Sequence, residues 1–209
     1  MNKLSIGILS SHGGSNMQAV VEAIKDGKLS AEISVLISNN SKSKVMERAH
    51  QENIPNYHLS QAKYPNPEQL DKNILKTLQD HNAEYILLLG YMKKLGPLTL
   101  SRYKNRMINI HPSLLPKYGG RGMYGHHVHA AVLENKEIET GVTIHLVDEE
   151  YDTGNIISQQ KVPVFENDTV EDLSERVLVT EHQLLVDTLC KICEEGISLW
   201  EHPVGERLL

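Results

Sequence analysis

The sequence predicts an α/β protein with a mainly parallel, twisted sheet, helices on both faces of that sheet, and a short mixed extension at the C-terminal end. Two observations support this fold class. Through the first half of the chain, short apolar runs of strand length alternate with stretches whose apolar residues recur at helical spacing. After about residue 110, this alternation gives way to two longer strands and one long amphipathic helix. Strands that alternate with helices form right-handed βαβ units, and such units build parallel sheets.

The first half of the chain carries the alternating pattern. Its expected strands are the apolar runs Leu4–Leu9, Ile33–Ile37, Asn56–Leu59, Tyr85–Leu89 and Met107–Ile110. Its expected helices are the segments Asn16–Lys28, Lys44–Glu52 and Pro67–His81, in which apolar residues fall three and four positions apart. This order predicts a Rossmann-like half over residues 1–110.

The second half, residues 111–209, follows a different pattern. A short helix is expected at His129–Glu134, and two longer strands at Gly141–Val147 and Asn155–Val164. A long amphipathic helix follows at Val170–Cys193, with these apolar positions among others: Val177, Leu184, Leu185, Leu189 and Ile192. The segment from Trp200 to Leu209 is expected to be a loose tail or a short final pairing. We expect both halves to form a single domain over residues 1–209.

Composition narrows the class of protein. The net charge of −6 argues against a nucleic-acid binder that depends on phosphate contacts, although a helix N-terminus can still bind a phosphate locally. No apolar run approaches the ~20 residues that span a bilayer. Two cysteines are too few for a disulfide scaffold. We therefore expect a cytoplasmic protein that acts on small molecules, without nucleic-acid or membrane partners, as a monomer or weak homodimer.

The most informative segment is Asn109–Pro116, which reads Asn-Ile-His-Pro-Ser-Leu-Leu-Pro directly after a buried strand. Asn109 and His111 are two positions apart, so on a strand both project from the same face. Pro112 cannot continue the strand ladder and favours extended geometry at His111. A carboxamide and an imidazole side by side at the carboxyl end of a strand suit acyl transfer, because both can face one developing oxyanion.

The loop Ser10–Asn16 lies between the first strand and the first helix, where open α/β sheets bind ligands. It matches neither G-x-G-x-x-G nor a Walker motif. Its glycines allow close approach of a ligand, Ser15 or Asn16 can cap the helix, and free amides there suit a phosphate. On this segment alone, a tight turn with a good cap is an equally good interpretation.

The acidic loop Asp148–Gly154 separates the two longer strands. One of its carboxylates can support His111, raising the pKa of the imidazole and fixing its orientation. Spacing does not say which acid does this, and a solvated turn is the alternative.

Two further clusters are weaker candidates. His126, His127 and His129 lie close together, but no Glu or Cys stands at a recognised ligand spacing beside them, so we expect no metal. Cys190 and Cys193 form a single C-x-x-C near the end of a helix, where ordinary helix residues are expected.

Three segments together resemble the phosphoribosylglycinamide formyltransferase family, folate-dependent enzymes of purine biosynthesis. They are Asn109–Pro116, Tyr151–Gly154 (Tyr-Asp-Thr-Gly) and Gly13–Asn16 (Gly-Gly-Ser-Asn). The Asn/His/Asp set is shared by all transferases and hydrolases that use 10-formyltetrahydrofolate. The Gly-Gly-Ser-Asn loop, Thr180–His182 and the chain length narrow the resemblance to this family. The likeness covers nearly the whole chain and implies the formyltransferase fold.

The resemblance implies roles for three groups of residues. The catalytic group is Asn109, His111 and Asp152. The group that holds the substrate phosphate and ribose hydroxyls is Gly14, Ser15, Asn16 and Glu181. The group that lines the folate site is Met92, Lys93, Lys94, Leu95 and Asn109. The segment 118–127 is often shorter in relatives, and the resemblance gives it no role.

The implied reaction moves a formyl group from 10-formyltetrahydrofolate, the co-substrate, to the amine of 5′-phosphoribosylglycinamide, without a metal. Two other enzymes of the same chemistry are alternatives: a sugar-nucleotide N-formyltransferase and a formyltetrahydrofolate hydrolase. A catalytically silent nucleotide-binding module is the alternative of a different class. Such a module has no need of Asn109, His111 and Asp152 together.

Overall fold

The computed structural model describes residues 3–195, so the expected tail Trp200–Leu209 lies outside the described residues. The chain divides into two compact units between Ile108 and Asn109. The sequence placed its change of pattern two residues later, at residue 110. That the chain acts as one domain stays a prediction.

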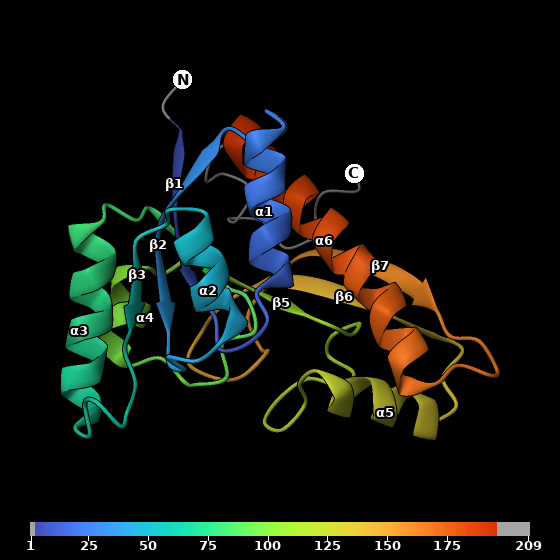
Figure 1. The fold of residues 1–209 in the computed structure, drawn as a ribbon. Helices are drawn as coiled ribbons and strands as arrows, with labels where there is room; N and C mark the ends of the chain where they lie inside the picture. Colours follow the sequence, from blue (N-terminus) through green and yellow to red (C-terminus); the bar gives the residue numbers. More distant parts are fainter. Residues whose placement is uncertain (1–2, 196–209) are drawn as a thin grey trace. The chain divides into compact units, whose positions relative to one another are not determined.

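The strands of the first unit form a parallel arrangement (Figure 1). The central strand β1 (Leu4–Leu9) pairs in parallel with β2 (Ala31–Ser38) on one side and with β4 (Tyr85–Leu88) on the other. β2 also pairs in parallel with β3 (Asn56–His58). All but the first residue of β1 are buried, as expected for a strand covered on both faces.

Helices cover both sides of these strands (Figure 1). α1 (Ser15–Lys25) and α2 (Lys44–Gln51) contact each other on one side, and α3 (Pro67–Asp80) and α4 (Pro97–Arg102) contact each other on the opposite side. The sequence did not predict α4, which has only six residues. Its N-terminal amides are capped by a side chain of α3. The Asp71 carboxylate accepts hydrogen bonds from the backbone amides of Leu98 at 2.8 Å and Thr99 at 3.1 Å.

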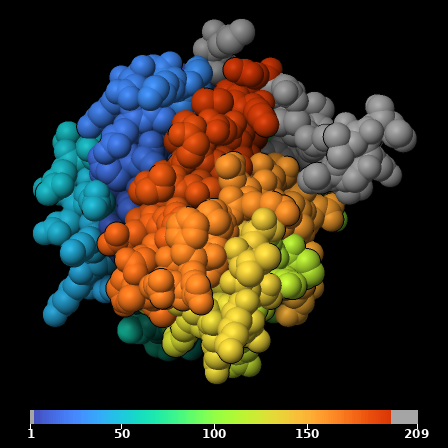
Figure 2. Space-filling view, turned by 90° about the vertical axis from the view of Figure 1, so that its right-hand side faces the viewer, coloured from blue at the N-terminus to red at the C-terminus, as the bar shows by residue number. Residues whose placement is uncertain are grey.

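β5 (Met107–His111) runs into the second unit, which continues with α5 (His126–Glu134). β6 (Glu139–Leu146) and β7 (Ile156–Pro163) form an antiparallel pair. The unit ends with α6 (Val170–Glu195), which contacts α5, β6 and β7. Figure 2 shows α6, in orange to red, running beside the yellow surface of α5.

The buried face of α6 confirms the predicted stripe. Each of its named apolar positions is at most 7% exposed: Val177, Leu184, Leu185, Leu189 and Ile192. The antiparallel pair is also as expected, with β6 buried from Thr140 onward and β7 exposed at Gln159–Lys161. The predicted fold class, α/β with a mainly parallel sheet and a mixed C-terminal extension, is confirmed. Within residues 3–195, no helix is long and apolar enough to cross a membrane.

Candidate active site

β5 carries two polar side chains on one face. It extends one residue further than predicted, to His111, and Pro112 follows. Asn109 is half-buried and His111 is 4% exposed. Ile110, between them, is buried and packs on the other face. The predicted pairing of a carboxamide and an imidazole at this strand end is therefore present.

Asn109 lies between an imidazole from β6 and a carboxylate from the acidic loop. Its amide nitrogen Nδ2 is 3.0 Å from Nε2 of His145 and 3.3 Å from Oδ1 of Asp152. Nδ1 of His145 is 2.7 Å from the carbonyl oxygen of Leu146, so this nitrogen donates and carries the ring proton. In the neutral ring, Nε2 of His145 is then an acceptor, and Asn109 donates to it.

The His111 ring is oriented by the backbone of the following loop. Nε2 of His111 is 2.7 Å from the carbonyl oxygen of Tyr118, and because a carbonyl only accepts, Nε2 carries the proton. Nδ1 faces Asp152, with 3.6 Å between Nδ1 and Oδ2. The structure thus brings Asn109, His111 and Asp152 together within the second unit.

The electrostatic balance at His111 differs from the sequence-based expectation. We expected the carboxylate to raise the pKa of this imidazole. Burial instead lowers the pKa of His111 below its usual 6.5, and the charge of Asp152 and the bond to Tyr118 oppose burial only in part. The free-energy cost of removing an imidazolium from water is larger than the attraction that it gains from one carboxylate at 3.6 Å. His111 is therefore neutral at neutral pH, with a free electron pair on Nδ1.

Asp152 is the acid of the loop Asp148–Gly154 that faces the imidazoles. Its backbone is left-handed, with φ of 59°, and Oδ2 accepts a hydrogen bond of 2.9 Å from the amide of Gly120. Burial alone would raise the pKa of Asp152, but His145, His111 and the Gly120 amide outweigh it and lower the pKa. Asp148 instead closes the turn by accepting from the Thr153 hydroxyl at 2.9 Å.

The expected phosphate loop lies in the first unit, at the start of α1. Gly14 caps this helix through a left-handed backbone, with φ of 75° and no side-chain hydrogen bond. The expectation that Ser15 or Asn16 caps the helix is therefore wrong, since both residues lie within the first turn. A Cβ at Gly14 would lie 2.6 Å from Cγ2 of Val45, so the close packing of α2 requires glycine here. Amides of a first helical turn have no partner within the helix itself, and such amides can bind an anion.

Ser11 joins this loop to the expected folate segment, within the first unit. The Ser11 hydroxyl accepts from the amide of Met92 at 2.9 Å and donates to Oδ1 of Asn39 at 2.5 Å. The amide of Ser11 donates to the Gly90 carbonyl at 3.1 Å. In the segment itself, Met92 is half-buried, Lys93 and Lys94 are exposed, and Leu95 is buried. The expected folate role of Met92–Leu95 stays a prediction.

The remaining candidates lie in the helices of the second unit. Glu181 is half-buried in the middle of α6. His126 and His127 are exposed at the start of α5, whereas His129 is buried, and burial, with His126 and His111 nearby, lowers the pKa of His129 to about 4. Among residues 3–195, no three His, Cys, Asp or Glu side chains are arranged to hold a metal ion.

Comparison with known proteins assigns the chain to a family. Residues 4–189 match the formyl transferase family. The phosphoribosylglycinamide formyltransferase of Escherichia coli K12 is 36% identical over 208 residues, which make up 98% of this chain and 96% of that protein. The chain belongs to the phosphoribosylglycinamide formyltransferase family. A chloroplastic enzyme of the same name from Vigna unguiculata is 39% identical over 94% of this chain, although the chain spans only 63% of that relative.

A solved structure of this family has the same fold. The phosphoribosylglycinamide formyltransferase of Bacillus halodurans is 35% identical, with a TM-score of 0.86 over 95% of this chain and 100% of that chain. The family identified from the sequence motifs and the fold class are both confirmed.

One residue of this candidate site was missed from the sequence. His145 is 2% exposed and contacts both Asn109 and Asp152, with 3.5 Å between its Nε2 and Oδ1 of Asp152. Its signal in the sequence is a single imidazole inside the apolar strand run Val142–Val147. A buried imidazole in such a run needs polar partners, and that requirement could have drawn attention to it.

Proposed function

We propose that this protein transfers the formyl group of 10-formyltetrahydrofolate to the amine of 5′-phosphoribosylglycinamide. The products are the N-formyl ribonucleotide and tetrahydrofolate, in de novo purine (IMP) biosynthesis. The observation that carries the proposal is the cluster of Asn109, His111 and Asp152, in a chain that aligns along nearly its whole length with the E. coli enzyme of this name. The remaining proposed contacts are the phosphate at Gly14–Asn16, the ribose at Glu181 and the folate at Met92–Leu95.

Asn109 is proposed to stabilise the oxyanion. As the amine attacks, the formyl carbon becomes tetrahedral and its oxygen gains negative charge. Of the two Asn109 N–H contacts, the one to Asp152 is the longer, at 3.3 Å, and exceeds the usual length of such a bond. This N–H is the one available to the developing oxyanion, while the 3.0 Å contact to His145 holds the carboxamide in place.

His111 is proposed to move the proton. Because Nε2 of His111 donates to Tyr118, the free electron pair lies on Nδ1. Nδ1 takes a proton from the attacking amine, and the resulting imidazolium lies beside the Asp152 carboxylate, which stabilises its charge. The imidazolium then returns the proton to the folate nitrogen as the bond from that nitrogen to carbon breaks. This assignment differs from the expectation of an imidazole whose pKa is raised by the carboxylate.

A formyl-transfer assay tests the proposed function. The protein is incubated with 10-formyltetrahydrofolate, with and without 5′-phosphoribosylglycinamide, and both tetrahydrofolate and the N-formyl product are measured. We expect both products in equal amounts, and only when the acceptor is present. Equal folate turnover without the acceptor would make the protein a hydrolase, and formylation of an amino-sugar nucleotide instead would change the acceptor. No turnover with any of these would contradict the enzymatic proposal.

A further inference from the structure

We propose that Glu137 and the hydroxyl group of Tyr118 position the His111 imidazole, acting through the backbone of residues 117–120. Glu137 does not contact His111, so it is a positioning residue. The kinetic part of this inference rests on the proposed function. Its structural part concerns which ring nitrogen of His111 carries the proton, and this can be measured in the protein without substrates.

Residues 117–120 bind both members of the imidazole–carboxylate pair. The carbonyl oxygen of Tyr118 accepts from Nε2 of His111 at 2.7 Å, and the amide of Gly120 donates to Oδ2 of Asp152 at 2.9 Å. Two backbone groups, two residues apart, therefore set the orientation of the imidazole and of the carboxylate that faces it. A shift of this segment alters both at once.

The backbone of this segment needs support from outside. Tyr118 has a φ of 54°, a left-handed conformation that is unfavourable for a residue with a side chain. Such a conformation persists only where neighbouring contacts hold it. At the inner end, the Ser113 hydroxyl donates to the Lys117 carbonyl at 2.6 Å. Gly119 packs so closely that an added Cβ would lie 2.5 Å from Cδ2 of Leu115.

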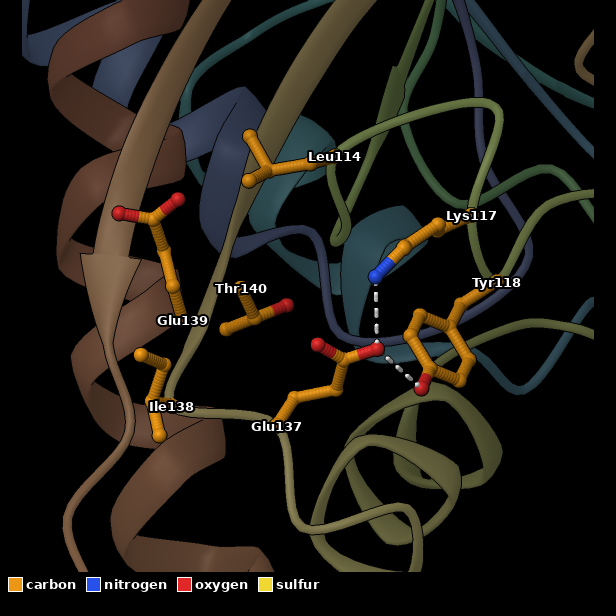
Figure 3. Close-up of a pocket in the computed structure, with 7 residues that line it drawn as sticks. All are labelled: Leu114, Lys117, Tyr118, Glu137, Ile138, Glu139 and Thr140. Atoms are coloured by element: carbon orange, nitrogen blue, oxygen red, sulfur yellow. Dashed lines mark hydrogen bonds and ion pairs between the residues drawn. The ribbon is translucent and has the colours of Figure 1, made fainter.

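The side chain of Glu137 supplies the support at the outer end (Figure 3). One carboxylate oxygen, Oε1, accepts from the Tyr118 hydroxyl at 3.0 Å and from Nζ of Lys117 at 2.9 Å. The Lys117 side chain is 67% exposed and that of Glu137 only 26%. An exposed lysine contributes little. The bond from the phenol to the carboxylate is charge-assisted and more specific, so it is the contact that keeps Tyr118 in place.

The surroundings limit how much this bond contributes. Lys117, Tyr118 and Glu137 lie along a groove of about 380 Å³ that is also lined by Leu114 and Ile138 (Figure 3). Water in the groove competes for the carboxylate and the phenol. Losing the bond should therefore loosen the segment without unfolding the protein.

Loosening the segment has a defined chemical result. When the Tyr118 carbonyl moves away, Nε2 of His111 loses its acceptor, and the tautomer protonated on Nδ1 becomes populated. In that tautomer, Nδ1 no longer has a free electron pair. It cannot take the proton of the attacking amine, so only part of the enzyme is competent at any moment.

The tautomer is the direct test. The free protein, labelled with ¹⁵N-histidine, is studied by NMR, and the His111 ring signals are assigned by their loss in His111→Gln. We expect one tautomer, protonated on Nε2, in the wild type and a mixture in Tyr118→Phe, with a smaller change of the same kind in Glu137→Gln. The matched control is Glu139→Gln, because Glu139 lines the same groove but pairs with Lys161. It should leave the His111 signals unchanged. Unchanged His111 signals in Tyr118→Phe would overturn the inference. If Tyr118→Phe does not fold, unchanged signals in Glu137→Gln would overturn it.

Kinetics separate this inference from the proposed function. In the formyl-transfer assay, Tyr118→Phe should lower kcat about 3- to 10-fold, the effect of weakening one hydrogen bond. The KM of both substrates should stay within twofold, and Glu139→Gln should match the wild type. A tautomer change in a protein that transfers no formyl group would support the positioning role and refute the proposed function. Full kcat in Tyr118→Phe would refute the role even if formyl transfer is confirmed.

Discussion

Two imidazoles of the site hold their ring protons on different nitrogens, because each donates to a different backbone carbonyl. His111 donates through Nε2 to Tyr118, and His145 donates through Nδ1 to Leu146. The opposite nitrogen of each ring can accept when it carries no proton. Nε2 of His145 contacts the Asn109 carboxamide, and Nδ1 of His111 is the nitrogen that we propose for the proton of the substrate amine.

Replacing Asn109 by Ala tests the oxyanion role. The substitution removes the N–H that faces the developing charge, so kcat should fall by roughly 10²- to 10³-fold. The proposed phosphate contacts, and the folate contacts other than that of Asn109 itself, lie at other residues, so the KM values should change little. Steady-state kinetics with each substrate varied in turn measure both quantities. A kcat close to that of the wild type would remove Asn109 from the chemistry.

Replacing Asp152 by Asn tests the charge balance at His111. Activity needs neutral His111, so kcat/KM falls as the pH drops through the pKa of this group, which lies below 6.5. Asp152 raises that pKa against the effect of burial. In Asp152→Asn, the pKa falls further and the acid limb of the pH profile moves to lower pH. The plateau value of kcat/KM also falls, by about tenfold or more, because the His111 imidazolium no longer has a carboxylate beside it. If the acid limb of Asp152→Asn lies at the same pH as that of the wild type, Asp152 does not act on His111.

At the residue scale, the sequence predicts what depends on local spacing. Asn109 and His111 could be placed on one face because they are two apart on a strand. The choice of Asp152 over Asp148 depends on a left-handed turn that the spacing does not reveal. His145 reaches the site through the position of β6, which is likewise a matter of tertiary structure. The carboxylate does raise the pKa of His111 as expected, but the net shift is downward because burial outweighs it, and the sequence does not show the depth of burial.

At the scale of elements, the start of α1 depends on the backbone of Gly14 and its contact with α2. In Gly14→Ala, the methyl group meets Val45 at 2.6 Å and the backbone is held at a φ of 75°. The free energy of unfolding should fall by about 1–3 kcal/mol. Gly27→Ala is the matched control, since Gly27 has a φ of 72° but no atom within 4 Å of an added Cβ. Gly27→Ala should lower the free energy of unfolding by only about 1 kcal/mol. Urea unfolding measures this free energy for both variants, and equal decreases would show that the contact with Val45 does not matter.

The elements were predicted best where they are long and periodic. The α6 stripe and the β1 run were recognised because their hydrophobic patterns extend over many residues. α4 was missed because a cap from Asp71, 26 positions before Pro97, supports a helix of only six residues. The cap of α1 was assigned to the wrong residue because Ser15 and Asn16 are common caps, whereas the contact that selects Gly14 comes from another helix.

At the scale of the whole molecule, the family match runs from residue 4 to residue 189 and so includes residues of both units. The proposed phosphate loop belongs to the first unit, and Asn109, His111, Asp152 and Glu181 belong to the second. With a net charge of −6, the protein does not attract an anionic substrate by its overall field. In our proposal, recognition of a phosphate therefore depends on the local dipole and amides at the start of α1.

The most direct test is the single-turnover rate of formyl transfer in His111→Gln, with both substrates saturating. Glutamine can still donate to the Tyr118 carbonyl but cannot take the amine proton. The proposed mechanism predicts a rate lower by roughly 10²- to 10⁴-fold, with folding and folate affinity retained. A single-turnover rate equal to that of the wild type would contradict it.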